Sequence, residues 1–134
     1  MSQVSFKKVG AVILLVSNMD RSIKFYRDTL GLVVKNISDE WTEFFTSGTV
    51  LALHPAKTKV KHNPNMLVGF MVSDLDSIAN SLRSKNIKFF KEPKEESFGK
   101  HAIIEDPDGH LISIAEIKSK SSEGFDLIGL IGAE

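Results

Sequence analysis

A repeated pentapeptide constrains the fold of this 134-residue chain more than any other feature of its sequence. VSNMD at residues 16–20 recurs as VSDLD at residues 72–76, an offset of 56 residues. Each copy follows a short apolar run and precedes apolar residues at helical spacing. Such self-similarity predicts two copies of one supersecondary unit that bury their apolar surfaces in the same domain.

Each copy predicts the order β-α-β-β-β. The apolar runs at residues 9–16 and 67–72 are typical of buried strands. Asn18 and Asp74 suit helix N-caps, because their side-chain oxygens accept a bond from an unpaired backbone N–H. The first helix is expected to end at Gly31 and the second at Asn86. The remaining strands are predicted at residues 32–37, 41–46 and 50–53 in the first copy, and at 87–91, 100–105 and 111–117 in the second.

Composition excludes several classes of function. Seventeen basic and seventeen acidic side chains cancel, so the chain lacks the positive field that nucleic-acid or anionic-membrane binding requires. The absence of cysteine excludes disulfides, thiolate metal sites and a cysteine nucleophile. An apolar run of eight residues is too short to span a bilayer. We therefore expect a cytoplasmic protein with no nucleic-acid and no membrane partner.

Four segments together resemble the vicinal oxygen chelate superfamily, which contains glyoxalase I, extradiol dioxygenases and bleomycin-resistance proteins. They are VSNMDRS at 16–22, FYRDTLGL at 25–32, FGK at 98–100 and DPDGH at 106–110. The resemblance implies an α+β fold, in which two βαβββ modules in one chain form curled mixed sheets that enclose a cup. It predicts a single domain over residues 1–117, with modules at 8–54 and 66–117, a linker at 55–65 and a C-terminal tail at 118–134. It also implies a homodimer.

The same resemblance implies four positions from which metal-dependent relatives bind one divalent ion. Here they are occupied by Ala11, Ala52, Leu67 and Ser113. Methyl and isobutyl groups have no lone pair, and a neutral serine hydroxyl is a weak ligand for such an ion. We therefore expect no metal and no other cofactor at these positions, and the usual mechanism of the family is not predicted for this chain.

Strand alternation predicts which side chains line the cup. An apolar lining with small residues at the former ligand positions suits a small hydrophobic or aromatic molecule. The alternative is that apolar side chains simply fill the cup. The predicted lining residues are Ala11, Ile13, Leu15, Val50, Ala52, His54, Leu67, Gly69, Met71, Leu111, Ser113 and Ala115.

Polar and aromatic candidates near the cup are few. His54 follows Ala52 on the same strand face, where it is either a hydrogen-bonding group or base, or an exposed strand end. A relocated metal site would use His54 and His101 with Glu43 or Glu105. Trp41, Phe44 and Phe45 have two possible roles: they stack on a flat ligand, or they complete the core.

Three functions remain, and we rank a metal-free small-molecule binder first. The second is a glyoxalase-related lyase, isomerase or dioxygenase-type enzyme, with a relocated metal or with His54 as acid or base. The third is a non-catalytic scaffold, since residues 125–131 of the tail carry an apolar cluster that suits a docking segment or a lid.

Overall fold

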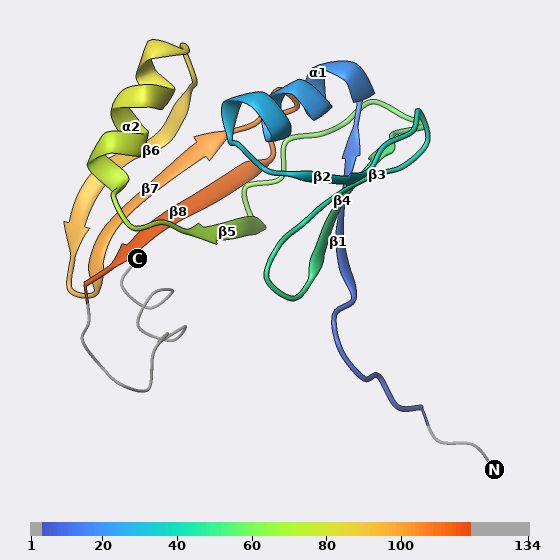
Figure 1. Ribbon diagram of the computed structural model, residues 1–134, viewed down its shortest axis with the longest axis horizontal. Coiled ribbons are helices and arrows are strands. Elements are labelled where there is room, and N and C mark those ends of the chain that lie inside the picture. Colours follow the sequence, from blue (N-terminus) through green and yellow to red (C-terminus); the bar gives the residue numbers. More distant parts are fainter. Residues whose placement is uncertain (1–3, 119–134) are drawn as a thin grey trace. The chain divides into compact units, whose positions relative to one another are not determined.

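The computed structural model of the chain describes residues 4–118 and divides after Val60 into two compact units (Figure 1). The division falls inside the predicted linker. Unit 1 precedes the division and unit 2 follows it. The part of the predicted tail from residue 119 onward lies outside the described residues.

Unit 1 contains one four-stranded mixed sheet and one helical segment (Figure 1). Its sheet has the order β1-β4-β3-β2, in which β1 is parallel to β4 and the other neighbours are antiparallel. The elements are β1 (Ala11–Val16), α1 (Met19–Lys24), a π-helical continuation η1 (Phe25–Thr29), β2 (Val34–Asn36), β3 (Thr42–Phe44) and β4 (Val50–Pro55).

Unit 2 repeats this topology with the strand order β5-β8-β7-β6, and β5 is parallel to β8. The predicted order β-α-β-β-β is therefore confirmed in both copies. Its elements are β5 (Leu67–Met71), α2 (Leu75–Ser84), β6 (Phe89–Glu96), β7 (Gly99–Glu105) and β8 (Leu111–Ile117).

The predicted helix boundaries are also confirmed. The side chain of Asn18 accepts a bond from the backbone N–H of Arg21, and that of Asp74 accepts from Ser77. Gly31 and Asn86 follow the two helical segments with positive φ angles of 79° and 59°. These angles place the backbone in the left-handed region that ends helices.

Several elements differ in extent from the sequence-based prediction, and strands β2 and β3 are both shorter than predicted. The last turn of the first helix widens to a π-turn, in which the backbone N–H of Leu30 donates to the carbonyl of Phe25. Strand β6 runs to Glu96 instead of ending near Lys91, although it contains Pro93. Because β6 is an edge strand with a register shift between Lys91 and Lys94, it tolerates a residue without an N–H.

One face of each sheet packs against the helix of its own unit and forms that unit's core. In unit 1, Tyr26 of η1 is fully buried and lies 6.0 Å from Phe44, measured between ring centroids. In unit 2, Leu75, Ala79 and Leu82 form the buried stripe of α2. The buried strand residues of these cores are Leu14, Val16, Phe44, Leu51 and Leu53 in unit 1, and Ala102, Ile104, Ile112 and Ile114 in unit 2.

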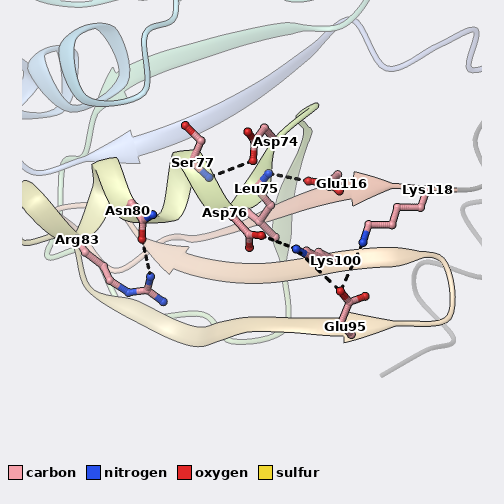
Figure 2. A network of polar contacts seen from close by, with 10 residues as sticks. All are labelled: Asp74, Leu75, Asp76, Ser77, Asn80, Arg83, Glu95, Lys100, Glu116 and Lys118. Carbon is pink, nitrogen blue, oxygen red and sulfur yellow. Dashed lines mark hydrogen bonds and ion pairs between the residues drawn. The ribbon is translucent and has the colours of Figure 1, made fainter.

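Polar contacts fix the start of α2 on its sheet (Figure 2). The backbone N–H of Leu75 donates to the carboxylate of Glu116 at 2.8 Å, which satisfies one of the unpaired donors of the first turn. Asp76 forms an ion pair with Lys100, and Glu95 lies 3.9 Å from Lys100. These contacts join the helix to β7 and β8, and join β7 to β6.

Candidate functional site

Each sheet has a second face, opposite its helix, which we call the open face. On β1, Leu14 and Val16 are buried beneath the helix, whereas Ile13 and Leu15 are 49% and 50% exposed. Strand β5 alternates in the same way, and its Leu67 and Met71 are exposed. The open faces therefore carry the side chains that strand alternation predicted for the cup.

The open face of unit 1 is built around Ala52 on β4. Strand pairing sets Ile13 on one side of Ala52 and Glu43 on the other. His54 pairs with Leu15, and the ring of Trp41 lies edge-on to the ring of His54 at 6.1 Å between centroids. Two aromatic rings, a carboxylate and two exposed aliphatic side chains thus share one sheet face.

Glu43 is held in position by two uncharged donors. The indole Nε1–H of Trp41 donates to its Oε1 at 2.9 Å, and the amide Nδ2 of Asn36 donates to its Oε2 at 3.1 Å. These bonds, the Trp41 bond first, lower the pKa of Glu43 below its usual range, because they stabilise the charged form. Glu43 is therefore an ionised carboxylate on a mostly apolar face.

His54 has a fixed tautomer when it is neutral. Its Nδ1 lies 2.8 Å from the carbonyl oxygen of Pro55, and a carbonyl oxygen only accepts. Nδ1 therefore carries the proton and Nε2 keeps its lone pair. In this form the imidazole is able to accept a proton or a hydrogen bond through Nε2.

The open face of unit 2 has different chemistry. Ser113 pairs with Gly69 and Ile103, and its hydroxyl lies 2.7 Å from Nε2 of His101. Both side chains are buried, and the ring of Phe98 lies edge-on to His101 at 6.1 Å between centroids. The sequence marked Ser113 and His101 separately, but it did not predict their contact, which depends on the β7–β8 register.

A shallow hollow of about 410 Å³ lies at one end of unit 2 and was not predicted. His62 accounts for part of it, because its ring lies 6.2 Å from that of Phe90 and its Nδ1 is 3.1 Å from the carbonyl oxygen of Gly109. Lys88 and Glu105 form an ion pair at 3.3 Å beside it. The lining residues are His62, Lys88, Phe89, Phe90, Glu105 and Gly109.

The twelve predicted lining residues differ in exposure. All lie at open-face positions of their own unit, but their role as a pocket lining stays a prediction, as do the homodimer and the cytoplasmic location. Exposed are Ile13, Leu15, Leu67, Gly69 and Met71; half-buried are Ala11, Val50 and His54; buried are Ala52, Leu111, Ser113 and Ala115.

The donor set at the four family positions does not fit a divalent metal ion. Ala11, Ala52 and Leu67 offer no lone pair, and the Ser113 hydroxyl is engaged by His101. Within residues 4–118, no group of three or more His, Asp or Glu side chains is arranged to hold a metal ion. The relocated site also draws on both units, with His54 and Glu43 in unit 1 and His101 and Glu105 in unit 2.

Comparison with known proteins identifies the family. A model of the Glyoxalase/Bleomycin resistance protein/Dioxygenase superfamily matches residues 8–114, and the chain belongs to this superfamily. The chain is 29% identical over 114 residues to the phenazine antibiotic resistance protein EhpR of Enterobacter agglomerans, which covers 78% of this chain and 88% of that relative.

Solved structures show the same fold at lower identity. A glyoxalase/dioxygenase from Nostoc punctiforme superimposes with a TM-score of 0.73 at 21% identity, covering 89% of this chain and 99% of that chain. A protein of unknown function from Agrobacterium tumefaciens gives a TM-score of 0.72 at 24% identity, with 84% and 96% covered. None of the helices in residues 4–118 has the length and apolar character that a membrane span requires.

Proposed function

We propose that this chain binds a small, flat, hydrophobic molecule on the open face of unit 1 and uses no metal ion. The observation that carries the proposal is the carboxylate of Glu43, fixed by Trp41 and Asn36 among exposed apolar side chains. Small-molecule sites combine such apolar surface with a few well-placed polar groups.

Exposed apolar area on this face supports the proposal. Ile13 and Leu15 are about half exposed, and Phe45, which follows β3, is 56% exposed. Covering them with a ligand removes apolar surface from water, which is favourable by about 25 cal/mol per Å². The rings of Trp41 and His54 add an aromatic surface on which a planar molecule is able to stack.

Similarity to EhpR suggests the chemical class of ligand to test first. Its name describes resistance to phenazine antibiotics. A phenazine is a flat tricyclic heteroaromatic molecule, which suits an aromatic and apolar face.

Fluorescence titration with phenazine tests the proposal directly, because Trp41 is the single tryptophan of the chain. We expect saturable quenching of Trp41 and a raised melting temperature. Leu15→Ser should weaken binding, whereas Val4→Ser, which changes an exposed residue outside the sheets, should not. Quenching no greater than that of free N-acetyltryptophanamide, with an unchanged melting temperature, would contradict the proposal.

Elemental analysis tests the metal-free part. Protein purified without chelators should contain far less than one equivalent of zinc, nickel, manganese or iron. A stoichiometric amount of any of them, bound more weakly after Ser113→Ala or His101→Ala, would overturn it.

One observation favours an enzyme as the second candidate. The bond from His54 Nδ1–H to the Pro55 carbonyl leaves Nε2 as a proton acceptor on the same face as Glu43. A metal-free isomerase or lyase would use such a group as general base. Deuterium exchange from D₂O into an enolisable ketone such as dihydroxyacetone, lost in His54→Gln, would support it. Exchange at the same rate in both proteins would remove it.

A further inference from the structure

We infer that Glu43 makes the open face of unit 1 selective for planar heteroaromatic molecules that carry a protonated nitrogen. This inference rests on the proposed binding function and adds the charge of the ligand to it.

The two groups that hold Glu43 leave its charge uncompensated. Trp41 and Asn36 are both neutral donors, so the arrangement keeps a net charge of −1. Lys35 is the cation that faces it, but its Nζ is 4.0 Å from Oε2 and its side chain is 45% exposed. An exposed pair at that distance is weak.

Glu43 also retains acceptor capacity. An ionised carboxylate has about four lone-pair sites, and the bonds from Trp41 and Asn36 occupy one on each oxygen. The side chain is 20% exposed, so a ligand is able to reach it. A cationic N–H would form a charge-assisted hydrogen bond there, and such bonds are about twice as strong as neutral ones.

Unit 2 lacks this arrangement in the part that the structure describes. In unit 1, Glu43 pairs across the sheet with Ala52, and in unit 2, Ile103 pairs with Ser113. Because Ala52 and Ser113 are equivalent positions, Ile103 occupies the place of Glu43. The unit 2 carboxylates of Glu105 and Glu96 each pair with a lysine, at 3.3 and 3.2 Å, which is closer than the 4.0 Å between Lys35 and Glu43. The charge preference is therefore a property of unit 1.

Three flat tricyclic probes of different charge test the inference at pH 7. They are 9-aminoacridine as the cation, phenazine as the neutral molecule and phenazine-1-carboxylate as the anion. We expect the native protein to bind the cation about tenfold more tightly than phenazine, and the anion more weakly than either.

Two matched variants test whether Glu43 causes the preference for the cation. Glu43→Gln should bring the cation-to-phenazine affinity ratio close to one, because it removes the charge and keeps a side chain of similar size. Glu40→Gln removes an equal charge from an exposed residue three positions away and should leave the ratio unchanged. An unaltered ratio in Glu43→Gln, or an equal loss in Glu40→Gln, would overturn the inference.

The native protein provides a second measurement that does not depend on a variant folding. The pKa of Glu43 lies below the usual carboxyl range, so the selectivity should stay constant from pH 8 to pH 5.5. Loss of selectivity over that range would overturn the role of Glu43. If phenazine binds but the cation binds no more tightly, this inference alone fails. If no probe binds, the proposed function fails with it.

Discussion

The two units share one topology but differ at nearly every polar position of their open faces. Strand register makes Ile13 of unit 1 equivalent to Gly69 of unit 2, and Ala52 equivalent to Ser113. In the same way Glu43 corresponds to Ile103, and His54 corresponds to Ala115. An ionised carboxylate in one unit thus corresponds to an isoleucine in the other. Unit 2 instead carries the buried hydrogen bond between Ser113 and His101.

The helix-facing positions have diverged much less. Leu51 and Leu53 correspond to Ile112 and Ile114, and Phe44 corresponds to Ile104. All six are buried and apolar. The comparison teaches that packing against the helix specifies the repeated fold, because buried polar groups there would need partners. The open faces are then able to vary with function.

The largest effect that we expect comes from a glycine specific to unit 2. Gly99 has φ of +146°, and a Cβ at this position would clash with the backbone oxygen of Glu116. Gly99→Ala should lower the free energy of unfolding by about 3 kcal/mol, from combined backbone strain and overlap. Urea denaturation measures it.

Gly69→Ala is the matched control, because nothing lies within 4 Å of a Cβ at Gly69 and its φ is ordinary. Its unit 1 equivalent is already Ile13. We expect a change of less than about 1 kcal/mol in either direction. Similar losses for the two variants would mean that the β7–β8 register differs from the one described.

The next largest effect concerns the buried pair of unit 2. Ser113→Ala removes the hydroxyl that contacts His101 and leaves the imidazole without that bond, so we expect a loss of about 1–2 kcal/mol in the free energy of unfolding. Ala52, at the equivalent position of unit 1, shows that the backbone accepts alanine there. Ser97→Ala, in the exposed β6–β7 turn, is the control, and an equal effect in both would remove the special role of Ser113.

A smaller effect tests how unit 1 holds its carboxylate. Trp41→Phe keeps an aromatic ring but removes the Nε1–H that donates to Glu43. The pKa of Glu43 should then rise toward its usual value, because the largest cause of its lowering is gone. A ¹³C NMR titration of the Glu43 carboxyl measures the change. The pKa of Asp76 in unit 2, which the hydrogen bond from Lys100 lowers, should not change.

Most of the fold was predictable because its determinants are local. The repeated pentapeptide placed both helix starts, and the caps at Asn18 and Asp74 formed as predicted. Alternation along β1 correctly separated Leu14 and Val16 from Ile13 and Leu15. Strand β6 was predicted too short, because its extension past Pro93 depends on being an edge strand, which is a property of the assembled sheet.

The candidate site was predictable only in part. Ala52 and His54 could be placed on one face from period-2 alternation, and stacking was one of two roles predicted for Trp41, but the contact between Trp41 and Glu43 was not predicted. Their bond, and their place beside Ala52 and His54, depend on how β3 is registered against β4. The same limit applies to Ser113 and His101. Alternation gives the face of a strand, whereas register decides which side chains meet.

The smallest expected effect compares two aspartates at equivalent positions of the repeat. Asp20 and Asp76 both lie in the first turn of their helices, where a negative charge is favourable. Within residues 4–118, Asp76 forms an ion pair with Lys100, whereas Asp20 has no such ion pair. Asp20→Asn therefore removes only the favourable interaction of the charge with the helix N-terminus. Asp76→Asn removes that interaction and the ion pair with Lys100 as well.

The dependence on pH follows from the direction of each shift. The hydrogen bond to Lys100 lowers the pKa of Asp76, so this contribution to stability is present above the usual carboxyl pKa and is lost as the pH falls through the lowered value. The same bond raises the pKa of Lys100, so its contribution is lost only at strongly alkaline pH. Asp76→Asn should thus lower the melting temperature more than Asp20→Asn at pH 7, by a margin that shrinks toward pH 3 and in high salt. An unchanged margin at pH 3 would mean that the difference between the units arises from packing around α2, not from the charge of Asp76.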